Sequence, residues 1–408
     1  MLKESKYNVY IKKEEHYLVF NTLYGGLAEL SQEEYEGIKD LSSHFFSDEE
    51  MKMLMENGFI IKKGIDEFTI FNEIRNKIVM YEKQRENCYT IAVTTECNAR
   101  CAYCYEKGAN SLKMDMQTVH EIVCFIEKNS INNIISNITW FGGEPLVNAE
   151  IITYMCDLLN EKGIKYNSSI ISNGLLFTPQ MVSVAKMKWK LSSAQITLDG
   201  MGKKYNAIKN YISKERDPFV TVINNIDALL QEGIEVNIRL NISKDNYDEI
   251  VEAIKYLSER YSFQENLFIY PAFISGGEMD EYSEEEKVDV INNIIDILPF
   301  YSFVGHKSML SELPSLNACM RGDDNSLFID ADGSVCRCEH YAGRKKKQNI
   351  KEKNWIQDFH NDYTFDEKCK ECNFFPRCLG GCMDNRINGK FFCSMDKYII
   401  PAVINSLF

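Results

Sequence analysis

Residues 94–108 read TTECNARCAYCYEKG and place three cysteines, Cys97, Cys101 and Cys104, within eight positions. They follow YTIAVTT, residues 89–95, whose β-branched and aromatic content predicts a strand. A structural zinc site usually takes four protein ligands, and this stretch contains no fourth cysteine and no histidine. Three thiolates on a loop after a strand therefore favour an iron–sulfur cluster that keeps one iron open for another ligand.

The CxxxCxxC spacing resembles that of the radical S-adenosylmethionine (SAM) superfamily, and Tyr103 before the third cysteine also fits the family pattern. In that family the open iron of a [4Fe-4S] cluster binds the amino and carboxylate groups of SAM's methionine. The resemblance implies reductive cleavage of SAM to a 5′-deoxyadenosyl radical, which removes a hydrogen atom from a substrate. A zinc ligand set with a distant fourth residue is the alternative for this motif alone.

Strand-like runs alternate with helical periodicity from about residue 87 to residue 300. After the first run, they recur at 137–145, 168–174, 194–200, 235–243 and 266–275. Six such units predict an α/β fold, either a parallel barrel or an open doubly wound sheet. The resemblance implies the partial (β/α)6 radical SAM barrel for residues 87–300, with its site at the carboxyl ends of the strands.

Polar motifs fall at the predicted strand ends and provide candidates for SAM binding. These candidates are Gly142, Gly143 and Glu144 in FGGEP, Ser172 and Asn173 in ISNG, Asp199 in TLDG, and Arg239 in NIRLN. The resemblance implies that the GGE segment binds the methionine amino group. The serine, the asparagine and the aspartate offer groups suited to the ribose, and the arginine suits the methionine carboxylate. Each motif alone is more often an ordinary turn or a solvated charge.

Residues 301–408 lose regular periodicity and gain cysteines. The predicted metal ligands here are Cys319, Cys338, Cys369, Cys372, Cys378, Cys382 and Cys393. Their spacing resembles the SPASM extension of radical SAM enzymes that modify peptides and proteins. The resemblance implies two auxiliary [4Fe-4S] clusters and hence three clusters in the whole chain.

Carried over by position, Cys319, Cys338 and Cys382 hold the first auxiliary cluster, and the other four cysteines hold the second. The first cluster then lacks a fourth protein ligand. Either Cys336 fills that place or the iron is open to a substrate thiolate. A pair of zinc knuckles is the structural alternative for these spacings.

Residues 1–86 predict a small domain of strands and helices. YNVYIKK and HYLVFNTL read as paired strands, and Ser31 with Glu34 and Ser47 with Glu50 form two capping boxes for following helices. The order and length resemble the winged-helix-like peptide-recognition domain of maturases that act on ribosomally made peptides. That resemblance implies a precursor whose leader adds a strand to the sheet. A structural or dimerisation domain is the alternative.

Composition narrows the functional classes. The net charge of -14 argues against nucleic acid as a partner, and no apolar run is long enough to span a membrane. Since the N-terminus also lacks a secretory segment, we expect a cytoplasmic protein. The chain's 14 cysteines then indicate metal or redox chemistry, with Cys88, Cys124 and Cys156 expected in the apolar core.

Together these motifs predict a radical SAM oxidoreductase that installs a thioether or similar crosslink in a precursor peptide, with flavodoxin or ferredoxin as electron donor. The alternative enzyme resembles anaerobic sulfatase-maturing enzymes and oxidises a cysteine or serine to formylglycine. Glu339, directly after Cys338, stands where that family has its catalytic acidic residue, although as Glu rather than Asp. The non-enzymatic alternative is a structural metal protein or electron relay.

Overall fold

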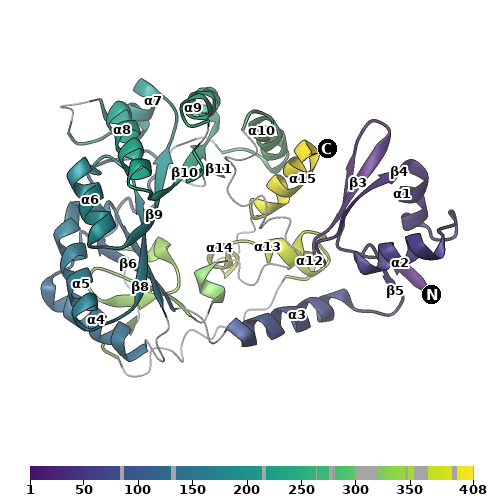
Figure 1. Cartoon of the computed structure of the whole chain (residues 1–408), viewed down its shortest axis with the longest axis horizontal. Coiled ribbons are helices and arrows are strands. Elements are labelled where there is room, and N and C mark those ends of the chain that lie inside the picture. The colour runs from purple at the N-terminus through teal and green to yellow at the C-terminus, as the bar shows by residue number, and fades with distance from the viewer. Residues whose placement is uncertain are drawn as a thin grey trace.

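The structure is a computed structural model of the 408-residue chain. It describes residues 1–82, 87–129, 135–213, 217–262, 264–274, 279, 281–298, 319–323, 325–344, 348–352, 366–387 and 393–407. Figure 1 shows a parallel sheet covered by helices on one side, a small N-terminal module on the other side, and C-terminal segments between the two.

Six parallel strands form the main part of the large sheet. They are β6 (Asn87–Thr94), β7 (Ser136–Gly142), β8 (Tyr166–Ser172), β9 (Leu191–Leu198), β10 (Glu235–Ile242) and β11 (Leu267–Phe273). All six predicted strands are confirmed, and they lie side by side in sequence order. A doubly wound sheet would reverse its strand order at a switch point, so the sequential order favours the barrel-type alternative.

Helices between the strands cover one face of this sheet (Figure 1). They are α4 (Met116–Asn129), α5 (Ala149–Glu161), α6 (Pro179–Met187), α7 (Gly202–Lys209), α8 (Pro218–Gln231), α9 (Tyr247–Arg260) and α10 (Glu284–Ile297). A four-residue turn, η2 (Pro145–Asn148), links β7 to α5, and η3 (Lys244–Asn246) precedes α9.

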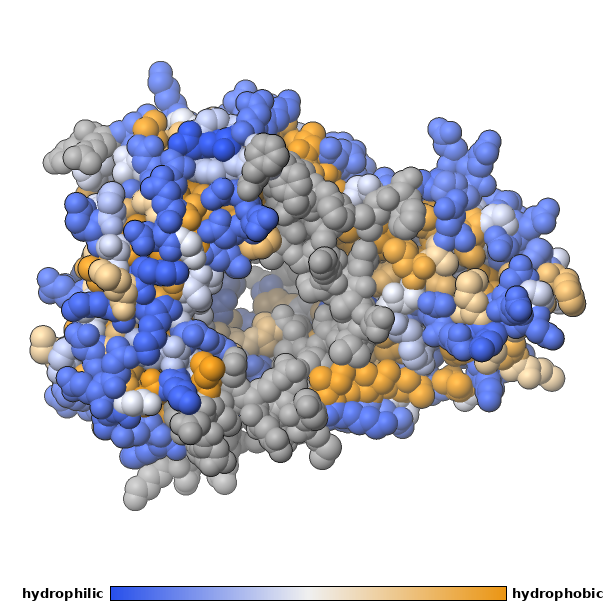
Figure 2. Space-filling view, viewed as in Figure 1, coloured by the Kyte–Doolittle hydropathy of each residue, from blue (hydrophilic) through white to orange (hydrophobic). Residues whose placement is uncertain are grey.

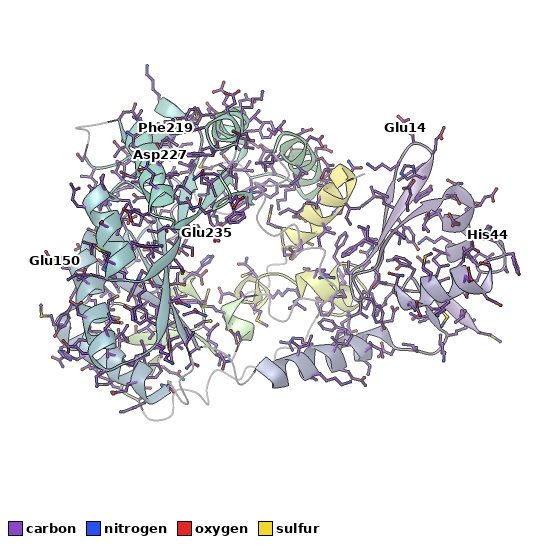
Figure 3. The ribbon with its side chains drawn as sticks, viewed as in Figure 1. Glu14, His44, Glu150, Phe219, Asp227 and Glu235 are labelled. Carbon is purple, nitrogen blue, oxygen red and sulfur yellow. The ribbon has the colours of Figure 1, made fainter. Side chains whose placement is uncertain are left out.

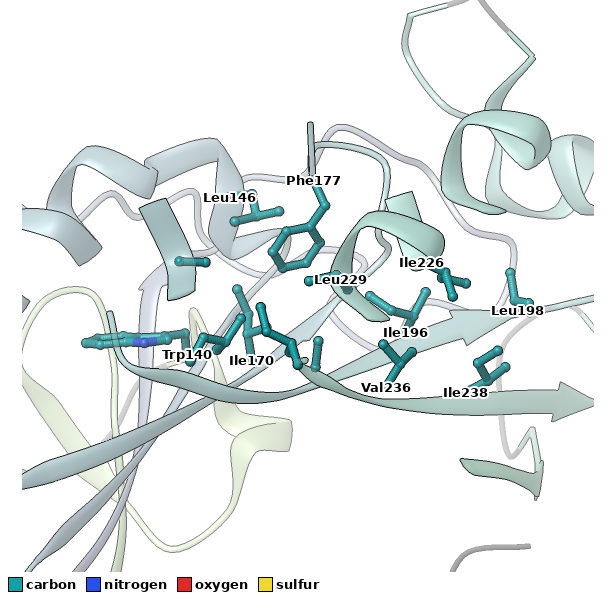
Figure 4. Packing of buried hydrophobic residues seen from close by; sticks show 14 of the residues in the cluster. Trp140, Leu146, Ile170, Phe177, Ile196, Leu198, Ile226, Leu229, Val236 and Ile238 are labelled. Carbon is teal, nitrogen blue, oxygen red and sulfur yellow. The ribbon is translucent and has the colours of Figure 1, made fainter. Parts of the chain in front are cut away.

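Every second side chain of each strand faces the helices, because successive side chains point to opposite sides of a sheet. Figure 4 shows Ile196 and Val236 packed with Phe177 and Leu229 in this layer. Burial of each such side chain is worth about 1.5–3 kcal/mol. The opposite face carries the polar residues of the strands, and Figure 2 shows a hollow between that side and the N-terminal module.

The sheet continues into the C-terminal part, which sequence reasoning did not predict. β12 (Ser326–Ile329) pairs in parallel with β6, and β13 (Ser334–Cys336) and β14 (Gln348–Asn349) follow it. These strands have two to four residues, too few to show a periodic pattern. The remaining elements are η5 (Met320–Gly322), η6 (Glu339–Tyr341), α12 (Glu367–Lys370), α13 (Phe375–Cys378), α14 (Met383–Ile387) and α15 (Asp396–Leu407).

The N-terminal module contains the predicted strands and helices. A meander of β2 (Asn8–Lys12), β3 (His16–Asn21) and β4 (Leu27–Ser31) precedes α1 (Gln32–Lys39) and α2 (Asp48–Glu56). β1 (Leu2–Glu4) pairs with β5 (Ile60–Lys62), and α3 (Glu67–Glu82) follows. Both predicted capping boxes are present. Figure 3 shows Glu14 and His44 on this module, far from Glu235 on the sheet.

One cysteine prediction is wrong, because Cys124 is exposed on α4 while Cys156 is buried and Cys88 is half-buried. The buried stripe of α4 runs through Val119, Ile122 and Ile126, and Cys124 points away from it at about 100° per residue. Within the described helices, none combines the length and apolar character needed to cross a membrane.

Candidate functional site

The three cysteines of the opening motif lie together on the loop between β6 and α4. All three are half-buried. Burial raises the pKa of Cys97 to about 12, and Glu144 and the other two thiols add to the rise. Burial also raises the pKa values of Cys101 and Cys104, although the Lys209 charge opposes this in both. Clustered thiols that resist ionisation suit a metal site, because a bound cation stabilises the thiolate.

The described loop between β6 and α4 contains no histidine and no cysteine besides these three. In the described parts of the chain, no three His, Cys, Asp or Glu side chains are gathered tightly enough to hold a single ion. The donor set itself fits a cluster with an open iron, because its members are three neighbouring sulfurs on one loop.

Both glycines of the GGE motif are required by the close approach of the cysteine loop. A Cβ on Gly142, whose φ is +145°, would meet the carbonyl oxygen of Thr94 at 2.0 Å. One on Gly143 would meet the carbonyl oxygens of Thr95 and Glu96 at 2.6 Å. Any side chain here would therefore displace the residues that lead directly into Cys97.

Glu144 joins the ends of β7 and β8. Its carboxylate is fully buried and accepts hydrogen bonds from the Ser172 hydroxyl at 2.9 Å and the Asn173 amide at 2.8 Å. Burial raises the pKa of Glu144 to about 7 in spite of these donors. The Asn173 side chain also donates to Asn98 Oδ1 at 2.7 Å, in the cysteine loop. The structure thus brings three of the predicted SAM-binding residues together beside the cysteines.

Asp199 lies in a buried polar network that includes a lysine missed by sequence reasoning. The Tyr103 hydroxyl donates to Asp199 Oδ2 at 2.7 Å, and Asn241 Nδ2 donates to Oδ1 at 3.0 Å. The Lys209 ammonium lies 3.0 Å from the same carboxylate, with side-chain exposures of only 2% and 0%. Burial by itself lowers the pKa of Lys209, but the nearby groups, chiefly the Asp199 carboxylate, together outweigh burial. The net pKa is raised well above the ordinary value, so the ammonium stays charged.

A sequence signal for Lys209 existed. It is four residues after Tyr205, and both residues are buried on the same face of α7. A lysine on the apolar side of a short amphipathic helix is unusual unless it is paired.

Arg239 does not lie at a strand end. It is within β10, three residues before the last one, and its Nε donates to Asn241 Oδ1 at 3.0 Å. Asn241, two residues later on the same face, is the β10 residue that reaches Tyr103 and Asp199. A role for Arg239 in binding the methionine carboxylate stays a prediction.

Cys319, Cys338 and Cys382, the first C-terminal cysteine set, include a residue close to the cysteine loop, because Cys338 lies two residues before His340, which contacts that loop. The ring of His340, which follows Glu339, stacks on Tyr105 at a centroid distance of 4.5 Å. Burial, then Glu106 and Glu339, raise the pKa of Tyr105, the residue after Cys104. Glu339 is therefore within electrostatic range of the cysteine loop as well as adjacent to Cys338.

Burial raises the pKa of Cys319, and the charge of Cys382 adds to the rise. Burial raises the pKa of Cys338 to about 12, and the charge of Cys336 adds to the rise. The Cys336 thiol donates to the carbonyl oxygen of Cys338 at 3.2 Å, so it lies beside this ligand candidate. Whether Cys336 is the fourth ligand stays open.

The second C-terminal set has cations directed at its sulfurs. Burial raises the pKa of Cys372, and the charges of Cys378 and Cys369 raise it further. Arg386 donates to the Cys369 sulfur at 2.9 Å, and Lys397 donates to the Cys393 sulfur at 3.6 Å. Cationic donors to two of the four thiols suit a thiolate-bound metal cluster, because they offset its negative charge.

Comparisons with known proteins agree with this geometry. The family model described as Radical SAM superfamily matches residues 91–257. The radical SAM cyclopropyl synthase TigE of Paramaledivibacter caminithermalis is 22% identical, over 93% of this chain and 89% of its own length. A cysteine-type anaerobic sulfatase-maturating enzyme of Clostridium novyi is 25% identical, over 77% and 94%. The GTP 3′,8-cyclase of Clostridium acetobutylicum is 31% identical, over 61% and 80%.

Two solved structures share the fold. The AdoMet-bound anSMEcpe structure superposes with a TM-score of 0.62 at 17% identity, covering 78% of this chain and 98% of its own. SuiB of Streptococcus suis, bound to precursor peptide SuiA, gives a TM-score of 0.54 at 16% identity, covering 97% and 99%. The chain belongs to the radical SAM superfamily. It is an enzyme related to the anaerobic sulfatase-maturating enzymes, with a fold similar to that of SuiB.

Proposed function

We propose that this enzyme installs a thioether or similar crosslink in a ribosomally made precursor peptide. The observation that carries the proposal is the contact between the two cysteine regions, where Tyr105 and His340 stack at 4.5 Å. A peptide side chain at this junction can reach both regions. Cys336 or a substrate thiolate would complete the first auxiliary cluster there.

When bound, the cluster and SAM would supply the 5′-deoxyadenosyl radical. The chain's own residues hold and orient these groups. Glu144 offers a buried carboxylate to an ammonium group, while Gly142 and Gly143 let the cysteine loop pack against it. The network of Asp199 and Lys209 fixes Tyr103 next to Cys104. These contacts support a preformed cofactor site.

Formylglycine formation is the second candidate, supported by the position of Glu339 next to Cys338 and near Tyr105. Anaerobic incubation with peptides encoded beside the gene separates the two candidates by product mass together with labelling by a hydrazide. A crosslink removes two hydrogen atoms, keeps sulfur and leaves no aldehyde. Oxidation of cysteine to formylglycine removes the sulfur, and oxidation of serine removes two hydrogen atoms but leaves an aldehyde that the hydrazide labels. Unmodified peptide together with vigorous SAM cleavage would reject those peptides as substrates, and absence of SAM cleavage would reject the enzymatic proposal.

In the three-stranded sheet of the N-terminal module, the outer edge of β4 is the candidate site for the leader of the precursor. On the β2 side, Asn373 Nδ2 donates to the carbonyl oxygen of Asn8 at 3.2 Å, so that edge is partly covered. Among the described strands, none pairs with the outer edge of β4. The backbone amide of Ser31 donates to the Glu34 carboxylate and therefore does not point toward β3. Backbone amides two residues apart on a strand point the same way. The Glu29 amide therefore faces the outer edge.

Glu29→Pro is expected to weaken precursor binding about threefold to tenfold, because it removes one main-chain hydrogen bond worth about 0.5–1.5 kcal/mol. Fluorescence anisotropy with a labelled precursor measures the change. Glu29→Ala controls for the lost charge and should bind normally. Ala28→Pro, whose amide faces β3, should instead lower the thermal stability of the module. Equal affinity of Glu29→Pro and wild type would remove the β4 edge as the binding site.

SAM binding is expected to weaken as the pH falls below about 7. The pKa of Glu144 is raised to about 7, so acidification protonates this carboxyl and removes its attraction for the methionine ammonium. The limiting change is about tenfold in Kd per pH unit. Equilibrium dialysis of the reconstituted enzyme at about pH 6 and about pH 8 tests this. Glu144→Gln should bind weakly at both values, and a pH-independent wild-type Kd would contradict the role.

A further inference from the structure

The N-terminal module packs against residues 366–382. This segment contains Cys369, Cys372 and Cys378, three of the four cysteines of the second C-terminal set. Two hydrogen bonds from residues between Cys372 and Cys378 converge on Thr22. The Thr22 hydroxyl donates to the carbonyl oxygen of Asn373 at 2.5 Å, and Arg377 Nε donates to the Thr22 carbonyl oxygen at 2.8 Å. Arg377 is only 5% exposed, so this interface is closed to solvent around it.

Apolar packing joins the same two parts of the chain. Phe375, which is 1% exposed, has its ring centroid 5.2 Å from that of Phe71 on α3. It shares a buried cluster with Tyr7, Leu23 and Leu379. Cys369 and Cys372 pack against this cluster as well. Two candidate metal ligands therefore belong to the interface itself.

This segment has little regular structure of its own. α12 and α13 have four residues each, and isolated helices shorter than about 12–15 residues are marginal in water. The chain then turns through left-handed conformations at Leu379, Gly380 and Gly381. The shape of residues 366–382 must therefore be imposed by its contacts, which are the N-terminal module on one side and the cysteine set on the other.

A second anchor begins next to the fourth cysteine of the set. α15 starts three residues after Cys393, and its Ile400 and Ile404 pack with Leu18 and Phe20 of β3. Figure 1 shows α12, α13 and α15 facing the N-terminal module from the sheet side. The second cysteine set thus joins the two segments, distant in sequence, that both contact the module.

We propose that metal binding by Cys369, Cys372, Cys378 and Cys393 builds the docking surface for the N-terminal module. In this arrangement the set acts on the position of residues 1–82, which goes beyond any role in electron transfer. A metal bound by all four thiols fixes α12, α13 and α15 relative to one another. Without the metal, Phe375 and Arg377 no longer hold their positions against Phe71 and Thr22, and the N-terminal module undocks.

Cys393→Ala is the variant of choice, because Cys393 is exposed and is not among the side chains of the apolar interface cluster. Hydrogen exchange of the reconstituted full-length protein measures docking directly. We expect exchange at least tenfold faster in residues 5–24 and 366–382, with unchanged exchange in α5 and β8. Cys319→Ala removes a candidate ligand of the other set, and Cys124→Ala removes an exposed cysteine. Both controls should keep wild-type protection in residues 5–24.

The reverse experiment perturbs the interface from the other side. Leu23→Asp should speed the loss of iron from the second set to a chelator at least fivefold. If Cys393→Ala does not fold, treatment of wild type with chelator should raise exchange in residues 5–24 in step with the loss of iron. Unchanged protection after that iron has left would overturn the proposal, as would an equal rise in Cys319→Ala. Because exchange and iron are measured without a peptide, these outcomes are independent of the substrate.

Discussion

Replacement of Cys97, Cys101 and Cys104 by alanine is expected to reduce 5′-deoxyadenosine formation to background, a loss of at least about a thousandfold. The three thiols are neighbours on one loop, and the charges of Cys101 and Cys104 both act on Cys97. Without the cluster, neither the electron nor the anchor for SAM is present. The assay is anaerobic chromatography of SAM cleavage products with dithionite as reductant.

Iron content gives this experiment a second measurement. Three four-iron clusters correspond to about twelve irons per chain, so the triple variant should retain about eight. Cys124→Ala, which changes an exposed cysteine on α4, should keep both the iron and the activity. Cleavage of SAM at the wild-type rate by the triple variant would refute the site. Zinc in place of iron would instead favour the structural alternatives.

The sequence was most informative where local rules and tertiary structure agree. The six strands of the large sheet were predictable because their buried faces are rich in β-branched and aromatic residues, as in Ile91, Val93 and Trp140. The two capping boxes were predictable because they depend on side chains only three residues apart. The cysteine spacings are read directly from the sequence, and metal binding by these cysteines stays a prediction.

What the sequence could not show are contacts between distant segments. β12 is only four residues long, and its place next to β6 depends on pairing with residues more than 200 positions earlier. Arg239 was expected at a strand end, but Asn241, two residues later on β10, is the residue that contacts Asp199. The position of Lys209 on the apolar face of α7 indicates a buried pair, but the sequence does not show that its partner is Asp199. Register and charge pairing across strands have no local signature.

Lys209→Met is expected to destabilise the enzyme by about 3–5 kcal/mol, because it leaves Asp199 buried without its cationic partner. The ammonium also donates to Thr197 Oγ1 at 2.7 Å and to the Tyr103 hydroxyl at 3.0 Å, and both bonds are lost with it. For a domain of this size, the midpoint of thermal unfolding should fall by roughly 6–20 °C. Lys203→Met, on the exposed side of the same helix, is the matched control and should change the midpoint little.

The double variant Lys209→Met with Asp199→Leu separates charge pairing from packing. If the loss in Lys209→Met comes from an unpaired buried carboxylate, removal of that carboxylate should restore much of the stability. Tyr103 would then lack its acceptor, so SAM binding should stay impaired although the fold recovers. Recovery of stability without recovery of SAM affinity is the result that assigns Asp199 and Lys209 to positioning the cysteine loop. Equal instability of single and double variants would show that the loss comes from the hydrogen bonds of Lys209 to Thr197 and Tyr103 rather than from an unpaired carboxylate.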